Sequence, residues 1–137
     1  MKIAEILNGA GLRVTKQRIA VLELLIEKRA PVSHAEITAA LADPLDKVTL
    51  YRTLQTLKEA GITHQVQGLD GAWRFCAHDN DAEGCPGGHA HFLCLSCGRM
   101  SCLTNQKLPR VEVPEGNEVE GKQLIVYGRC SGCRGGK

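Results

Sequence analysis

Apolar residues in the first sixty positions recur at spacings of three and four, which is the period of an amphipathic helix. The pattern predicts a short first helix that ends near Gly9 or Gly11 and three further helices after it. Their apolar stripes consist of Ile3, Ile6 and Leu7; Ile19, Leu22, Leu25 and Ile26; Ile37, Ala40 and Leu41; and Leu50, Leu54 and Leu57. The N-terminal half of the chain is therefore expected to be helical.

Residues that cap helices precede three of these stripes. Thr15, Ser33 and Asp46 each carry a side-chain oxygen that can accept a hydrogen bond from the first turn of a helix. Glu36 follows Ser33 by three positions, which completes a capping box. The third helix is expected to end at Asp43-Pro44, because proline interrupts the helical hydrogen bonds.

After Gly61 the apolar period changes from that of a helix to that of a strand. Residues 63–66 and 72–76 flank the turn dipeptide Asp70-Gly71, which predicts a β-hairpin. Short helices followed by a hairpin describe a winged helix-turn-helix, with the third and fourth helices as the pair and the hairpin as the wing. Arg52, Gln55, Thr56 and Glu59 lie opposite the leucines of the fourth helix, with Tyr51 on its flank. These residue types suit contact with DNA, although a solvated helix face is the common alternative.

The second half of the chain predicts a different kind of structure. A polar, glycine-rich stretch separates it from the first half, and short apolar runs predict strands at 90–95, 100–103, 111–113 and 123–127. Pro109, Pro114 and Gly116 argue against a long helix between these strands. The expected fold class is α+β: a winged-helix DNA-binding domain at 1–77, a hinge loop at 78–88, and a small α/β domain at 89–137.

Composition adds two constraints. The chain has 137 residues with 43% hydrophobic but only 4% aromatic content, and small domains with few aromatic residues commonly gain stability from a metal. The net charge of +2 does not decide whether a nucleic acid is bound. The sequence has neither an apolar run long enough for a membrane span nor the pattern of a signal peptide, so we expect a cytoplasmic protein with reduced thiols. Seven cysteines, an odd number, then favour metal ligation over disulfides.

Two C-x-x-C pairs carry the strongest chemical signal. Cys94 and Cys97 form the first pair, and Cys130 and Cys133 form the second. Four thiolates complete a tetrahedral zinc shell with no open position, so the predicted site is structural and holds one zinc per subunit. A redox C-x-x-C is the alternative, but it normally occurs singly in a thioredoxin-like unit, which this sequence does not resemble.

The other histidines and cysteines predict a second, regulatory zinc site. His89 and His91 alternate with Ala90, so on a regular strand they would share one face. Cys76, at the end of the wing, and Cys102, five residues beyond Cys97, could join them. His64, His78 and Cys85 complete the set of candidates, and the roles of His78 and Cys85 stay open. No H-E-x-x-H or H-x-E arrangement is present, so a zinc-dependent enzyme with a small-molecule substrate is not expected.

Several segments in combination resemble the ferric-uptake-regulator (Fur) family from about residue 3 to 133. They are Gly11-Leu-Arg-Val-Thr-Lys-Gln-Arg18, Val48-Thr-Leu-Tyr-Arg-Thr-Leu54, Leu57-x-x-Ala-Gly61, His89-x-His91-x-x-Cys94-x-x-Cys97-Gly98 and Cys130-x-x-Cys133. The resemblance implies a homodimeric, metal-dependent transcriptional repressor that binds a double-stranded DNA operator through its N-terminal winged helix and dimerises through its C-terminal domain. It implies that the four paired cysteines hold the structural zinc. DNA contacts are expected from Arg13, Lys16, Thr49, Tyr51 and Arg52.

Within the family, the sequence is most like the zinc-uptake-regulator (Zur) branch. Cys76 stands where that branch places a cysteine ligand, and Cys102 stands where many members carry a glutamate. His64 resembles a histidine that some Zur proteins use at the hinge. Thiolates in place of carboxylates favour zinc over ferrous iron. Control of zinc-uptake genes is therefore the expected function, and an iron-responsive or a peroxide- or thiol-sensing regulator is the alternative.

Three departures from the family pattern qualify the prediction. Ala90 cannot ligate a metal where members place Asp or His, so the third metal site of the family is expected to be absent. The long helix that members place after the first cysteine pair is expected to be replaced by the proline-containing stretch 104–118. The five candidates for the regulatory site exceed the four ligands of a tetrahedral zinc, so one is expected to be a bystander.

Overall fold

A computed structural model describes residues 2–77, 89–120 and 122–134. The chain forms two compact units, Met1–Gly84 and Cys85–Lys137. The predicted hinge loop at 78–88, with His78 and Cys85, lies outside the described residues. In the described parts of the chain, no helix combines the length and apolarity that a membrane crossing requires.

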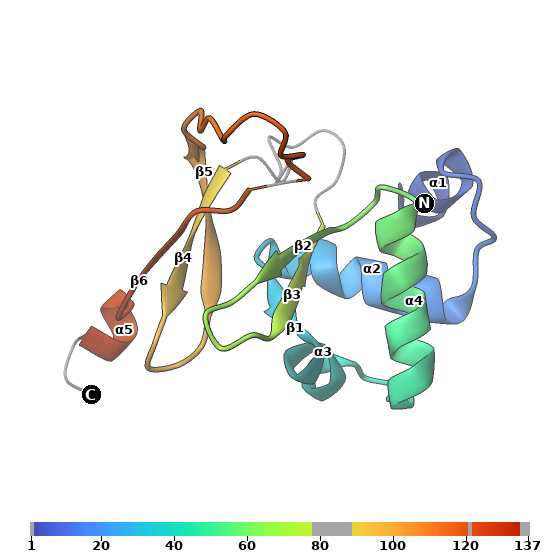
Figure 1. The fold of residues 1–137 in the computed structure, drawn as a ribbon. Helices are drawn as coiled ribbons and strands as arrows, with labels where there is room; N and C mark the ends of the chain where they lie inside the picture. The colour runs from blue at the N-terminus through green and yellow to red at the C-terminus, as the bar shows by residue number, and fades with distance from the viewer. Residues whose placement is uncertain (1, 78–88, 121, 135–137) are drawn as a thin grey trace. The chain divides into compact units, whose positions relative to one another are not determined.

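Four helices make up most of the N-terminal unit (Figure 1). They are α1 (Lys2–Gly9), α2 (Lys16–Lys28), α3 (His34–Ala40) and α4 (Lys47–Glu59). All four were predicted from the apolar periodicity. The third ends earlier than expected, at Ala40, because Leu41 already has an extended backbone (φ −70°, ψ 129°).

The predicted caps begin these helices as expected. The hydroxyl of Thr15 accepts a hydrogen bond from the N–H of Arg18 at 3.2 Å. Ser33 and Glu36 form the reciprocal capping box, with Ser33 N–H donating to Glu36 Oε1 at 2.7 Å and Glu36 N–H donating to Ser33 Oγ at 3.2 Å. Asp46 accepts from the N–H of Thr49. These local bonds define where each helix starts.

The predicted hairpin is present as β2 (His64–Gln67) and β3 (Trp73–Cys76), paired antiparallel. A short strand that the sequence pattern did not indicate, β1 (Val32–Ser33), pairs with the other edge of β3, so the strand order is β1-β3-β2. Two residues are too few to show an alternating pattern. This strand connects α2 and α3 to the wing, which gives a winged helix-turn-helix.

The core of the N-terminal unit consists of the predicted apolar stripes together with residues from the wing. Leu22, Leu25, Ile37, Leu50 and Leu57 are completely buried. The rest of the core consists of Leu7, Val21, Val32, Leu54, Phe75 and Ala77. All of these described core residues belong to the N-terminal unit.

The C-terminal unit is a three-stranded sheet followed by one turn of helix. Its strands are β4 (His89–Cys94), β5 (Met100–Lys107) and β6 (Ile125–Gly128), in the order β5-β4-β6, and α5 (Ser131–Arg134) follows them. Strand β4 pairs antiparallel with β5 and parallel with β6. The predicted strand at 100–103 ended four residues before β5 does, and the predicted strand at 123–127 began two residues before β6 does.

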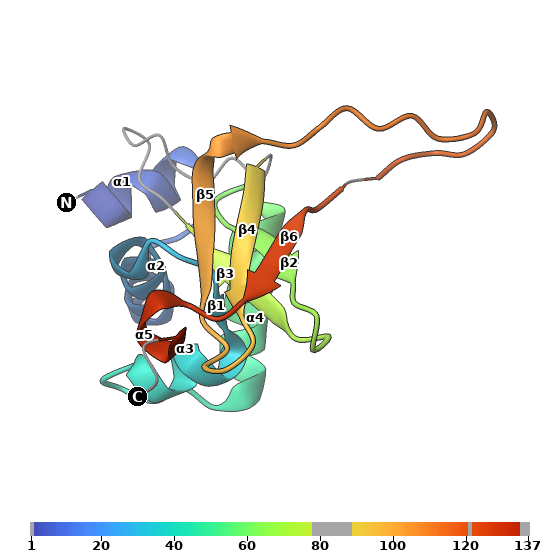
Figure 2. The same ribbon diagram turned by 90° about the vertical axis from the view of Figure 1, so that its left-hand side faces the viewer.

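Between β5 and β6, Figure 2 shows residues 108–120 projecting from the sheet and residues 122–124 leading back into β6. These residues contain neither helix nor strand. The expected absence of a long helix is confirmed, whereas the predicted strand at 111–113 is wrong. Pro109 and Pro114 flank those residues and lack the N–H that a ladder requires.

Candidate metal centre

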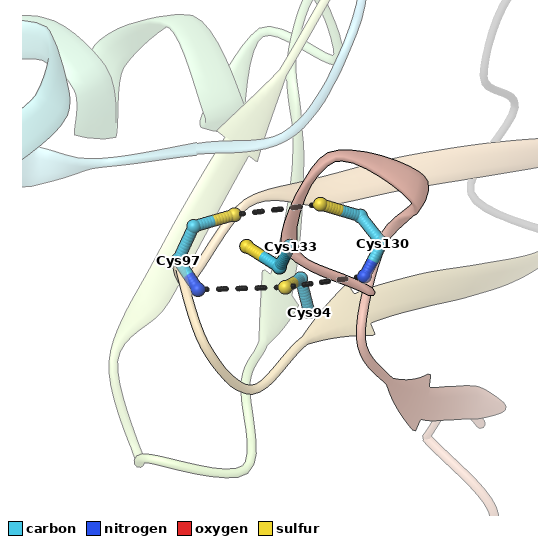
Figure 3. A group of neighbouring side chains, drawn as sticks. All are labelled: Cys94, Cys97, Cys130 and Cys133. Carbon is cyan, nitrogen blue, oxygen red and sulfur yellow. Dashed lines mark hydrogen bonds between the residues drawn. The ribbon is translucent and has the colours of Figure 1, made fainter. Parts of the chain in front are cut away.

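Four sulfur atoms meet at one end of the C-terminal sheet. The Sγ atoms of Cys94, Cys97, Cys130 and Cys133 all lie within 4.8 Å of one another. The distance between Cys97 Sγ and Cys130 Sγ is 3.9 Å, and Figure 3 shows both sulfurs directed toward the space between the two pairs. The sequence prediction that the two C-x-x-C pairs meet is confirmed.

Local backbone geometry holds the first pair in place. Cys94 is the last residue of β4, and its N–H donates to Arg99 O at 2.9 Å across the turn into β5. The N–H of Gly98 donates back to Cys94 O at 2.9 Å, with Gly98 at φ 78°, a conformation that favours glycine. The two cysteines are therefore positioned by the hairpin that joins β4 to β5.

The second pair is positioned by α5 and by the first pair. Cys130 stands immediately before α5 and Cys133 lies within it, and the N–H of Arg134 donates to Cys130 O at 2.8 Å. The N–H groups of Cys97 and Cys130 donate to the sulfur of Cys94 at 3.4 Å and 3.3 Å (Figure 3). Backbone amides from both pairs thus converge on one sulfur.

The close approach of the four sulfurs shifts the pKa values of their thiols. The hydrogen bond that the Cys97 N–H donates to the Cys94 sulfur, followed by the one from the Cys130 N–H, lowers the pKa of Cys94 to about 5. Bonds from the backbone and side chain of Cys133 also lower the pKa of Cys130. Contact with the sulfurs of Cys130 and Cys94 raises the pKa of Cys133 to about 12. Neighbouring sulfurs cannot all be deprotonated at neutral pH without a positive charge between them. A divalent cation would supply that charge and allow all four to be thiolates.

The geometry fits zinc. A tetrahedron with zinc–sulfur bonds of about 2.3 Å has sulfur–sulfur edges of about 3.8 Å, close to the distance between Cys97 and Cys130. Four sulfur donors leave no coordination position for a substrate or water. The cluster would hold a structural zinc, and its chemistry would be to bind the end of β4 to the start of α5.

The candidates for the regulatory site form one His–Cys pair in each unit. In the wing, His64 on β2 is the direct cross-strand partner of Cys76 on β3. In the C-terminal sheet, His91 on β4 is the direct cross-strand partner of Cys102 on β5. Directly opposed residues have Cβ atoms about 4.5–5.5 Å apart on one face of the sheet, which is close enough for two ligands of one ion.

The members of these pairs differ in exposure. Cys76 is completely buried, and His91 is 2% exposed, whereas His64 and Cys102 are half-buried. His89 begins β4, but the strand register shifts between His89 and Ala90, so the predicted sharing of a face with His91 does not follow from the strand period. The sequence pattern named all five residues but could not show which of them are cross-strand partners.

Polar residues of α2 and α4 line a hollow of about 260 Å³ in the N-terminal unit. Of the predicted DNA contacts, Thr49 and Arg52 lie in it. Its other residues are Thr15, Gln17, Arg18, Thr53 and Thr56, so it contains two arginines and no carboxylate. Arg18 was not among the predicted contacts, and only its position in this hollow indicates it. Its guanidinium donates to Arg13 O at 2.8 Å.

The remaining predicted DNA contacts lie outside this hollow. Arg13, Lys16 and Tyr51 are exposed, and Tyr51 lies on the opposite flank of α4. Two other polar residues of the α4 surface, Gln55 and Glu59, are joined by a hydrogen bond of 3.1 Å.

Comparison with known proteins identifies the family to which this chain is similar. The model of the ferric uptake regulator family matches residues 9–125. The peroxide operon regulator of Bacillus subtilis is 29% identical over 136 residues, which cover 94% of this chain and 89% of that protein.

Solved structures share the fold. The ferric uptake regulator of Vibrio cholerae aligns with a TM-score of 0.63 and 22% identity, covering 93% of this chain and 98% of that chain. A zinc uptake regulator complexed with zinc and DNA aligns with a TM-score of 0.62 and 22% identity, covering 96% and 89%. These relatives are regulators and not enzymes. With the family model matching most of its length, the chain belongs to the ferric uptake regulator family.

Proposed function

We propose that this member of a family of metal-responsive transcriptional regulators is a zinc-responsive repressor. It would bind double-stranded operator DNA as a homodimer in the cytoplasm and control genes for zinc uptake. The observation that carries the choice of metal is the pair of cross-strand His–Cys partners, His64–Cys76 and His91–Cys102. Two imidazoles and two thiolates are the ligands that zinc prefers, whereas carboxylate-rich sites suit ferrous iron and manganese better.

The proposed regulatory ligands are drawn from both units. His64 and Cys76 would come from the wing, and His91 and Cys102 from the C-terminal sheet. These four satisfy tetrahedral coordination, so His89 becomes the fifth candidate and either replaces His64 or stands outside the shell. The zinc would supply charge and geometry, and no chemistry beyond ligation is required of it.

Ligands in separate units can couple metal binding to DNA binding. The four side chains would be close together in one arrangement of the two units and separated in others. The ion would bind the first arrangement more tightly and so raise its population. If that arrangement also sets the two recognition helices of a dimer one helical turn apart, about 34 Å, operator affinity rises with zinc. DNA then strengthens zinc binding by the same factor.

The metal preference is testable with buffered metal ions. An operator duplex is first selected by the wild-type chain, with zinc, from a randomised pool, and its dissociation constant is measured over buffered zinc, ferrous iron and manganese. Zinc is expected to raise affinity at the lowest free concentration, because thiolate ligands favour it. If affinity does not change with any of the three, the chain is not a metal-dependent regulator. If ferrous iron alone raises it, the zinc assignment is wrong.

The surface proposed to bind DNA centres on α4 and its polar hollow. Arg18 and Arg52 provide two cations, and Thr49 lies beside them; no carboxylate lines the same hollow. Arginine and threonine side chains are common donors to phosphates and base edges. The predicted Arg13 and Lys16 add charge near the start of α2.

Replacement of Arg52 by alanine is expected to weaken operator binding by about 1–3 kcal/mol. The slope of log affinity against log salt concentration should also become shallower by about one. The loss arises because the variant lacks one of the cations that neutralise phosphate or bind a base edge. Fluorescence anisotropy of a labelled duplex over a range of salt concentrations measures both effects. Arg110→Ala removes the same charge from an exposed site in the C-terminal unit and should change neither. Equal losses in the two variants would show a general effect of charge and no contact by Arg52.

A peroxide sensor is the second candidate, and the relative in Bacillus subtilis that is named a peroxide operon regulator favours it. Cys76 is completely buried, which disfavours it as a reactive thiolate, whereas Cys102 is half-buried. Loss of DNA binding after peroxide treatment of the zinc-saturated protein would support this candidate. Retention of binding under that treatment would support the zinc-responsive function.

A further inference from the structure

We propose that Trp73, an exposed residue of the wing, contacts the sugar–phosphate backbone of the bound duplex, together with Tyr51 and Lys47 of α4. This inference rests on the proposed DNA-binding function and extends it to a second backbone contact on the other side of α4. Trp73 was not among the residues that the sequence pattern indicated for DNA contact.

The supporting feature is a hollow of about 710 Å³ in the N-terminal unit, between the start of α4, the start of α3 and the wing. Lys47 and Tyr51 line it from α4, and Trp73 lines it from β3. The chain has only one tryptophan, two tyrosines and two phenylalanines, and three of these five (Trp73, Tyr51 and Phe75) line this hollow. Tyr51 is 60% exposed and Trp73 is 47% exposed. Large aromatic surface is therefore concentrated where the described residues leave it exposed to solvent.

The position of this hollow on α4 indicates what covers it. Each helical residue is rotated by about 100° from the one before. Thr49 and Thr56, which line the arginine-containing hollow, therefore lie on the opposite flank of α4 from Lys47 and Tyr51. The exposed ridge between the two flanks carries Arg52. A helix inserted into the major groove presents its ridge to the bases and has a DNA strand on each side.

Charge in the aromatic hollow also suits a phosphate backbone. Asp70 is the one carboxylate among its lining residues, and Arg74, which is 4% exposed, binds it at 3.2 Å. That contact lowers the pKa of Asp70, so the pair is charged and mutually neutralised. Lys47 then leaves the hollow with a net positive charge. Aromatic rings against deoxyribose and an ammonium group against phosphate would hold one strand without reading its sequence.

The wall of the hollow is preformed. A Cβ atom at Gly68 would lie 2.1 Å from the guanidinium of Arg74, so a larger residue there would displace the group that binds Asp70. The N–H of Ala72 also donates to Asp70 at 3.0 Å. These contacts fix the turn that precedes Trp73, so little ordering is required of the wing when DNA binds.

Because Trp73 is the sole tryptophan, its fluorescence reports on this contact directly. The full-length, zinc-loaded protein is titrated with the selected operator duplex, and the quenching of Trp73 by neutral acrylamide is measured with and without DNA. DNA is expected to protect Trp73 from acrylamide. Trp73→Ala is expected to weaken binding about tenfold, by a similar factor for operator and non-operator duplexes, since a backbone contact carries no sequence information. Trp73→Phe should restore most of the loss.

Leu69→Ala is the matched control, because Leu69 lies in the same hairpin with 57% exposure but does not line the hollow. It should bind DNA as the wild type does. Unchanged acrylamide quenching in a complex that anisotropy shows to be formed, or equal losses in Trp73→Ala and Leu69→Ala, would overturn the contact while leaving the DNA-binding function intact. If the wild-type chain selects no duplex, the proposed function itself fails, and the inference fails with it.

Discussion

Replacement of Cys94 by serine is expected to unfold the C-terminal unit while the N-terminal unit remains folded. Cys94 is 1% exposed, and its sulfur accepts amide bonds from both cysteine pairs. A structural zinc contributes about 10–16 kcal/mol of apparent binding free energy in small domains. That is as large as the whole stability of a typical domain, about 5–15 kcal/mol. Besides Cys94, the buried hydrophobic residues described in this unit are Ala90, Leu93 and Met100, which make a small core.

The measurement is zinc content per chain together with amide resonances from the two units. In Cys94→Ser the dispersed resonances of β4, β5 and β6 should be lost, and those of α2 and α4 should persist, because the N-terminal core contains no residue of the C-terminal unit. Cys102→Ser, which alters a thiol of the same sheet outside the four-sulfur cluster, should retain both sets of resonances. A folded C-terminal sheet in Cys94→Ser without bound zinc would show that the cluster is not needed for folding.

The second large effect is expected in Cys102→Ser, which should fall from two bound zinc ions per chain to one and lose the zinc-dependent part of its DNA affinity. Cys102 is the cross-strand partner of His91, so its thiolate would be one of the four proposed regulatory ligands. Coupling between two sites typically amounts to about 5–150-fold in affinity, and a loss of about 50-fold at saturating zinc is expected. Metal analysis and anisotropy titrations over buffered zinc measure the two quantities.

Ser101→Ala is the matched control, because Ser101 is the adjacent, exposed residue of β5 and side chains of successive strand residues point to opposite faces. This variant should keep two zinc ions and full DNA affinity. If wild type and Cys102→Ser each bind one zinc ion with the same DNA affinity, the His–Cys pairs do not form a regulatory site, and the chain responds to another signal.

The two cysteine variants together test whether the regulatory site depends on the structural site. The structural cluster begins at Cys94, three residues after His91 on the same strand. Cys94→Ser is therefore expected to lose both zinc ions, because the strand that carries His91 would no longer be ordered. Cys102→Ser is expected to lose only the regulatory ion.

Local sequence determined most of the N-terminal unit. The caps at Thr15, Ser33 and Asp46, and the leucine stripe of α4, lie within a few residues of the bonds and contacts that they make. Helical period and capping are short-range properties, so they can be read without knowing the rest of the fold. Strand β1 was missed because two residues are too few to show an alternating pattern, and its pairing with β3 joins residues that are far apart in the chain.

The cysteine spacing likewise predicted that the four sulfurs meet, because two C-x-x-C pairs that share one zinc have few other ways to combine. The spacing did not show that amides of both pairs converge on Cys94, nor that residues 111–113 lie outside any strand. Both facts depend on contacts between residues that are far apart in the chain.

The sequence by itself thus determined the helices, the wing and the four cysteines, at 94, 97, 130 and 133, whose sulfurs the structure brings together. Only the tertiary structure decided that His64 faces Cys76 and that His91 faces Cys102. It also placed Trp73 and Tyr51 in one hollow. The physical reason is strand register: a shift of one residue moves a side chain to the other face of the sheet, and that register is set by the packing of the whole unit.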